Sequence, residues 1–269
     1  MPTVFADGPR RLTMGLGRLP PEDWLLVTEQ RANELAEKRR LLAVGAEVLA
    51  ELTEAEGAAS ELLATIEAYL ARHHPELEIA IDDGRALVRA GLSVQEDLCL
   101  LLPGPAGHRL VAAFVAFPAR WRLADKIGRP LATIHAPVPG FAERLGQPTE
   151  RLFAGLKDGT AVWRANWSLV DDPSLHQPQP STAAAAVVPE ALHLRVERQC
   201  LSRLPLSGAV AFTIHTFVRP LTEVVADPRL ALALADRLDE MPPDMLAYKA
   251  LDRSGTAAAR YLREQCGAG

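Results

Sequence analysis

Cysteine is scarce in this chain, and its three residues are scattered. Cys99, Cys200 and Cys266 lie far apart, and no CxxC pair occurs. Zinc knuckles and iron–sulfur sites need clustered thiolates, so the sequence supports neither kind of site. An odd number of isolated thiols also fits a reducing cytoplasm better than a disulfide-bonded secreted scaffold.

Long apolar runs are missing as well. Residues 1–17, MPTVFADGPRRLTMGLG, show no apolar segment followed by a cleavage pattern, which a secretory leader would have. The apolar run LCLLLPGPAG is closed by proline and glycine and is much shorter than a membrane span. We therefore expect a cytoplasmic protein with no membrane partner.

Basic charge is not in excess. The chain has 29 Lys and Arg against 34 Asp and Glu, for a formal net charge of −5. The longest basic run, Lys38–Arg40, follows Glu34 and Glu37 at helical spacing, which is typical of an ion-paired, solvent-exposed helix surface. We therefore expect no nucleic-acid partner.

What the chain does have is enough apolar residues for a full core: 48% are hydrophobic and 23% are charged. We expect a single domain over 1–269 in three parts. An N-terminal arm and helical cap cover 1–84, with helices from Pro20 to about 50 and over about 58–73. A core follows at 85–221, in which the Pro-, Ser- and Ala-rich stretch 171–190 reads as a mobile surface insertion. Helices return over 222–269.

Strand patterns concentrate in the core. Short helices, broken by Gly128, Pro130 and Pro137, are expected between 118 and 157. The fold class is therefore α+β, with two strands, several short helices and then three strands. The expected strand segments are 85–88, 97–102, 108–117, 161–169, 192–200 and 209–218.

Polar side chains line one face of the strand 192–200. Alternation places His193, Arg195, Glu197 and Gln199 together. In 209–218, one face carries Ala209, Ala211, Thr213 and His215, which are small and then polar. Such rows are either solvated or line a cavity for a ligand. In the second case Glu197 is the acid/base candidate, Arg195 holds it ionised or binds an oxyanion, and His215 donates to a ligand or binds a metal.

His135 stands between a helix-like segment and the stiff turn Pro137–Gly140. An imidazole fixed there is suited to bind a metal or haem iron. A histidine at a helix end is also commonly a cap or a satisfied buried polar group. The local sequence leaves both interpretations open.

Six ordered blocks resemble the haem-dependent oxidative N-demethylase family over about residues 14–262. The resemblance implies a haem-binding PAS-like domain, in which a five-stranded antiparallel sheet is flanked by short helices, with extra N- and C-terminal helices. The blocks are EDLCLL (96–101), FPARW (117–121), KIGRPLATIHAPVPG (126–140), RANWSL (164–169), HLRVERQCLSRLPLSGAVAFTIHTF (193–217) and YKAL (248–251).

The resemblance also implies an activity, which is the oxidative demethylation of a small amine such as dimethylamine by O2. The cofactor would be haem b, with its iron, and electrons would come from NADPH through separate flavin and iron–sulfur reductase subunits. A homo-oligomer is left open. The alternatives are a haem-based gas or redox sensor and a PAS-like module that binds a small molecule without iron.

Mapped onto this chain, the resemblance makes His135 the proximal iron ligand. Glu197 would be the acid of the oxygen-side pocket, with its charge state set by Arg195 or Arg198. His215 stands where the family more often has Arg or Lys, and would donate to oxygen or ligate iron. The remaining cofactor-binding candidates are Thr213 in the pocket and three cations for the haem propionates, Lys126, Arg129 and Arg164.

Overall fold

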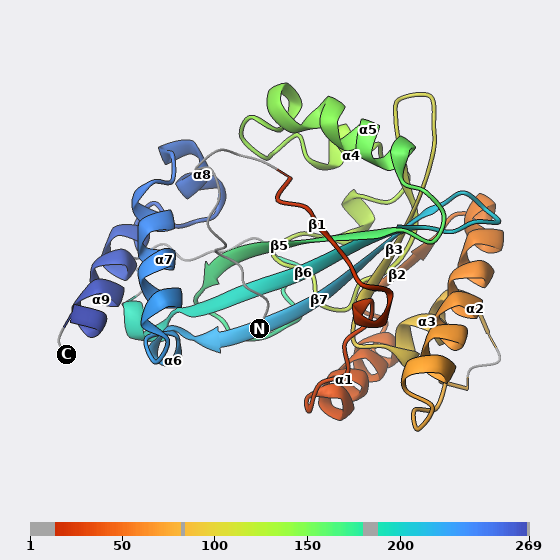
Figure 1. The fold of residues 1–269 in the computed structure, drawn as a ribbon, viewed down its shortest axis with the longest axis horizontal. Helices are drawn as coiled ribbons and strands as arrows, with labels where there is room; N and C mark the ends of the chain where they lie inside the picture. The colour runs from red at the N-terminus through yellow and green to blue at the C-terminus, as the bar shows by residue number, and fades with distance from the viewer. Residues whose placement is uncertain (1–13, 82–83, 180–187, 268–269) are drawn as a thin grey trace.

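One antiparallel sheet organises the molecule, as Figure 1 shows for the computed structural model, which describes residues 14–81, 84–179 and 188–267. In the described residues the sheet has seven strands in the order β1-β5-β6-β7-β3-β4-β2. Of the long central strands β5, β6 and β7, the last two carry the polar rows noted above. The strands are β1 (Gly17–Arg18), β2 (Leu49–Glu51), β3 (Asp97–Leu102), β4 (Arg109–Phe114), β5 (Ala161–Val170), β6 (His193–Arg203) and β7 (Val210–Pro220).

The α+β class is confirmed, but the five-stranded sheet is wrong because two short strands extend it. β1 pairs with β5 at one edge, and β2 pairs with β4 at the other. The expected strand at 85–88 is also wrong, because it begins the helix α3 (Ala86–Ser93). A short apolar run does not distinguish a buried strand from a buried helix. Here Gly91 decides the packing, since a Cβ on it would lie 2.4 Å from the Phe114 ring.

The N-terminal helices pack on one face of the sheet. The long helix expected to reach about 50 is interrupted: the 3-10 helix η1 (Pro21–Asp23) precedes α1 (Arg31–Ala43). Gly45, with φ of +70°, turns the chain from α1 toward β2. After the short turn η2 (Thr53–Ala55), α2 (Glu56–His73) confirms the second expected helix. Leu62, Ile66 and their neighbours form the main core with β3 and β4.

Lys38 corrects the expectation of a solvent-exposed basic run. Arg40 does pair with Glu37 on the surface, at 2.7 Å, but Lys38 is 0% exposed. Its Nζ donates to the carbonyl oxygens of Gly91, Val94 and Glu96 at 3.1, 2.8 and 2.6 Å. The buried ammonium therefore ties α1 to the connection between α3 and β3.

The opposite face of the sheet is covered by the segment between β4 and β5, drawn above the sheet in Figure 1. Leu131, Phe153 and Leu156 pack on Leu101, Leu201 and Val210 there. This segment contains η3 (Leu123–Asp125), α4 (Leu131–Ile134), the π-helical turn η4 (Ala142–Gly146) and α5 (Gln147–Gly155).

The C-terminal helices form a third cluster at the ends of β5 and β6, where Leu234 and Leu262 meet Leu169 and Leu194. They are α6 (Leu221–Val224), α7 (Pro228–Asp239), α8 (Pro243–Tyr248) and α9 (Gly255–Gly267), and the turn η5 (Pro189–Ala191) precedes β6. Within the described ranges, no helix combines the length and apolar character that crossing a membrane requires.

Part of the expected insertion is tied to the body of the molecule. His176 Nδ1 contacts the carbonyl oxygen of Ala116 at 2.7 Å, and Gln177 bonds through its backbone to Pro118 and Arg120. Residues 180–187 lie outside the described residues, so the mobility expected of the whole stretch stays a prediction.

Candidate functional site

Strand register divides the predicted site residues between the two faces of the sheet. Glu197 pairs across the sheet with Asn166 and Thr216, whereas Arg198 pairs with His215. Directly opposite residues point to the same face. Glu197 therefore lies on the face covered by α4 and α5, which we call the upper face, and His215 lies on the lower face. The structure does not bring Glu197 and His215 into one pocket.

His135 ends α4 above the upper face. Its Nδ1 lies 2.9 Å from the carbonyl oxygen of Leu131, and its ring stacks on Phe141 with centroids 4.5 Å apart. If Nδ1 carries the proton, it donates to that carbonyl and Nε2 keeps its lone pair. Nε2 has no hydrogen-bond partner among the described residues. Histidine ligands of metals are commonly oriented in this way, so the geometry suits an axial ligand.

Burial lowers the pKa of His135, and the charges of Lys126 and Arg164 lower it further. The imidazole is therefore neutral near pH 7, which is the state that binds a metal. Figure 1 shows α4 above the sheet that carries Arg164. Lys126 donates from Nζ to the Ile134 carbonyl at 2.9 Å, and Arg129 is exposed on the same segment.

Glu197 has one oxygen engaged and one free. Its Oε2 accepts from Asn166 Nδ2 at 3.3 Å and from Gln199 Nε2 at 2.8 Å. Its Oε1 lies 4.0 Å from Arg195 Nε and accepts no hydrogen bond from the described residues. The side chain is 14% exposed, so Oε1 can receive a donor from a ligand.

Arg164 lies beside Glu197 on the upper face, since it pairs with Gln199 one rung away. Its Nε is buried and has no hydrogen-bond partner. No residue in the described ranges forms an ion pair with its guanidinium. Burial lowers the pKa of Arg164, while the charge of Glu197 opposes that shift. A buried N–H donor without an acceptor is unfavourable, so the Nε of this half-buried side chain favours an anionic ligand.

Arg195 and Thr213 are placed differently from Glu197. Arg195 is 1% exposed and donates to the carbonyl oxygens of Phe117 and Leu175 at 2.6 and 3.0 Å. Both distances are shorter than the 4.0 Å between Arg195 Nε and Glu197 Oε1, so Arg195 chiefly anchors the chain around residues 117 and 175. Thr213 is buried on the lower face opposite Cys200, away from the upper-face residues.

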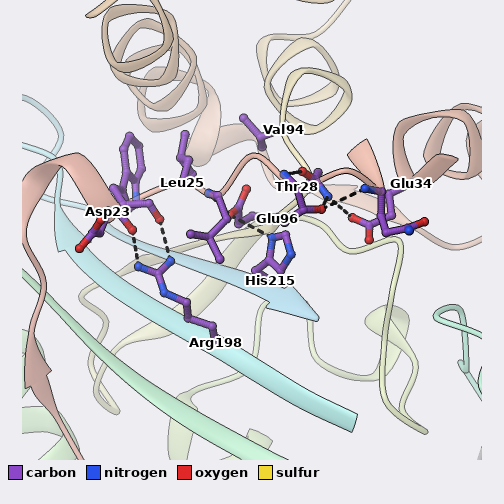
Figure 2. Close-up of polar contacts among 12 residues, drawn as sticks. Asp23, Leu25, Thr28, Glu34, Val94, Glu96, Arg198 and His215 are labelled. Carbon is purple, nitrogen blue, oxygen red and sulfur yellow. Dashed lines mark hydrogen bonds and ion pairs between the residues drawn. The ribbon is translucent and has the colours of Figure 1, made fainter. Parts of the chain in front are cut away.

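His215 belongs to a buried network on the lower face, drawn in Figure 2. Its Nδ1 lies 3.3 Å from Glu96 Oε1, which also accepts from the backbone of Leu26 at 2.8 Å. The two side chains are 2% and 1% exposed. Burial alone would raise the pKa of Glu96, but the hydrogen bond and charge of His215 and the Leu26 N–H together hold it below its usual value.

Arg198 completes this network by donating to the carbonyl oxygens of Asp23 and Trp24 (Figure 2). The network therefore fastens the chain segment 23–28 to the sheet. Arg198, like His215, lies on the opposite face from Glu197.

Lys249 is a site residue that reasoning from patterns missed. It follows α8, and its Nζ donates to the Trp167 carbonyl at 2.5 Å on the edge of β5, one residue from Asn166. Burial lowers the pKa of Lys249 to about 8, with Glu197 raising it and Arg164 lowering it. The block YKAL (248–251) was the signal that could have found it.

A cleft of about 290 Å³ lies against α4 and α5, beside His135, because its lining includes Leu131 and Phe141, both of which His135 contacts; none of the polar residues above lines it. Its lining is mainly apolar and includes Leu131, Phe141 and Glu150. We place the site by the unpartnered polar atoms of the upper face, because those atoms need a ligand and the apolar cleft does not.

Comparison with known families adds one finding. A family model described as haem-dependent oxidative N-demethylase, alpha subunit-like, matches residues 76–259. The match includes His135, Arg164, Glu197 and Lys249. It leaves out the segment 23–28 and α1.

Proposed function

The chain belongs to the haem-dependent oxidative N-demethylase, alpha subunit-like family, and on this premise we propose that it is the haem-binding catalytic subunit of an O2-dependent amine demethylase. The observation that carries the proposal is His135, whose Nδ1 contacts a backbone carbonyl while Nε2 stays free. A second observation supports it, since the carboxylate of Glu197 keeps a free oxygen on the sheet face that α4 covers.

The residues of the upper face fit haem b. His135 would ligate the iron through Nε2. Lys126 and Arg129 lie on the same segment as His135 and would meet the propionates at its rim. Arg164, the third cation expected for the propionates, faces the sheet side of the site instead. Bound haem would supply the activation of O2.

The proposed reaction removes one methyl group from an amine. One oxygen atom enters a C–H bond of the N-methyl group, and the resulting N–CH2OH splits at its C–N bond into formaldehyde and the demethylated amine. The second oxygen atom leaves as water, which takes up two protons and two electrons. The words alpha subunit-like in the family description support a multi-subunit assembly, and we propose that NADPH supplies the electrons through flavin and iron–sulfur partner subunits in the cytoplasm.

Glu197 has the chemistry to hold the amine. Its free Oε1 accepts an N–H of the substrate, while Asn166 and Gln199 fix Oε2. A carboxylate restrained in this way positions the N-methyl group and takes up or returns a proton at the amine nitrogen.

The deciding experiment is the visible absorption spectrum of the protein expressed with a haem precursor, followed by formaldehyde release from dimethylamine with a reductant and O2. We expect an intense Soret band and formaldehyde in proportion to the reductant consumed. No Soret band after reconstitution would reject the proposal. A Soret band without turnover of any secondary amine would favour a haem-based sensor.

A further inference from the structure

We propose that the substrate of this site is an N-methylated amino acid, such as N-methylglycine, whose carboxylate binds between Arg164 and Lys249 while its amine binds Glu197. The inference deepens the proposed demethylase function and rests on it. It concerns the class of amine that the upper face is built to take.

The first observation is the arrangement of opposite charges that do not pair. Arg164 and Glu197 occupy neighbouring rungs of β5 and β6 on the same face, as diagonal neighbours. Such neighbours have Cβ atoms roughly 7 Å apart, within reach of a direct ion pair. No ion pair forms between them within the described residues, and Arg164 Nε is buried without a partner. The guanidinium and the free Glu197 Oε1 are therefore both available to one ligand.

The second observation is Lys249. Its ammonium has three N–H donors, and the Trp167 carbonyl is its one hydrogen-bond acceptor in the described part of the chain. Ala250, which follows, has φ of +55°, an unusual backbone conformation for a residue other than glycine. The hydrogen bond to the Trp167 carbonyl holds the ammonium at the edge of β5, three residues along the strand from Arg164. Lys249 thus adds a second cation at β5, the strand that carries Arg164, and its remaining N–H donors have no hydrogen-bond acceptor among the described residues.

The charge balance discriminates between amines. The titratable groups around Glu197 are Arg164 on β5, Arg195 on β6, Tyr248 at the end of α8 and Lys249 directly after it. One carboxylate thus faces three cations, of which Arg195 is engaged with backbone carbonyls. A dimethylammonium ion would leave Arg164 and Lys249 uncompensated. An N-methylated amino acid brings its own carboxylate for those two groups and its own ammonium for Glu197.

The test compares N-methylglycine with dimethylamine on the haem-reconstituted protein, by calorimetric titration of each amine and by formaldehyde release. We expect N-methylglycine to bind at least about tenfold more tightly, since a charge-assisted hydrogen bond contributes that much. Arg164→Gln should reduce the ratio of the dissociation constant of dimethylamine to that of N-methylglycine about tenfold or more. Lys249→Met should reduce the same ratio. It is the variant to measure if Arg164→Gln does not fold.

Matched controls are Arg144→Gln and Lys157→Met, which alter exposed cations outside the site and should leave the ratio unchanged. Equal or tighter binding of dimethylamine by the wild type would overturn the inference. So would an Arg164→Gln variant that loses haem affinity but keeps the ratio, because the anion on Arg164 would then be a propionate. A wild type that binds no haem yet prefers N-methylglycine through Arg164 would reject the demethylase function and support the carboxylate site.

Discussion

Replacing His215 with alanine should destabilise the fold and leave haem coordination unchanged. The imidazole is 2% exposed and faces Glu96, which is 1% exposed, on the side of the sheet away from His135 and Glu197. The substitution removes the 3.3 Å contact between His215 Nδ1 and Glu96 Oε1. Glu96 then keeps the hydrogen bond from the Leu26 N–H.

The expected cost follows from leaving the buried Glu96 carboxylate without its imidazole partner. Removing one partner and leaving the other charge buried costs about 3–5 kcal/mol. For a chain of this size, 1 kcal/mol moves the melting temperature by about 2–4 °C, so His215→Ala should lower it by roughly 6–20 °C. Adding Glu96→Gln should restore part of the loss, because the uncompensated charge is then gone.

Urea unfolding and the Soret spectrum, measured on the same preparations, test this prediction. His215→Gln is the matched control, since its amide retains a hydrogen-bond donor toward Glu96. The pH dependence has a defined sign: the lowered pKa of Glu96 gives stability that is present above its unfolded value and is lost as pH falls through the folded value. A His215→Ala protein of unchanged stability whose Soret band shifts would refute the reasoning and make His215 an iron ligand.

Three further predictions concern other residues. His135→Ala should lose most of its haem while keeping its melting temperature within a few degrees, and full haem retention with an unchanged spectrum would remove the ligand assignment. Glu197→Gln should keep haem but lower the rate of formaldehyde release about 100-fold or more, and an unaffected rate would reject its role. Burial raises the pKa of Asp97 from 3.8 to about 6, so its contribution to stability should fall as pH rises from about 4 to about 6. Asp97→Asn should flatten urea-derived stability across that window, and an unchanged slope would contradict the assignment.

Much of the central sheet could be predicted from the sequence, because β5, β6 and β7 alternate apolar and polar residues along much of their length, and β3 and β4 are short, mostly apolar segments. The edge strands β1 and β2 could not be predicted, since a segment of two or three residues is too short to show an alternating pattern. The buried position of Lys38 was equally hidden. Its neighbours Arg39 and Arg40 are exposed, and only the carbonyl groups between α3 and β3 make a buried ammonium favourable.

The placement of His215 is a second feature that the sequence pattern could not predict. Alternation along one strand tells which residues share a face, but it does not tell which face of the neighbouring strand matches. That match is set by the turn between β6 and β7, where the Leu204 N–H donates to the Ala209 carbonyl and Gly208 has φ of +69°. A shift of one residue there would exchange the faces. The pattern correctly groups the residues that share a face with Glu197 and those that share a face with His215. It does not show that the two groups lie on opposite faces of the sheet.

β6 therefore serves two demands in alternate residues. Val196, Arg198 and Cys200 support the core and the N-terminal segment, while Glu197 and Gln199, which lie between them, face the proposed site on the upper face. Evolution can alter the substrate by changing the residues of β6 that face the proposed site, while the alternate residues keep the amount of folded protein constant. Relatives that process different amines can then diverge at residues directly adjacent to those that they must retain.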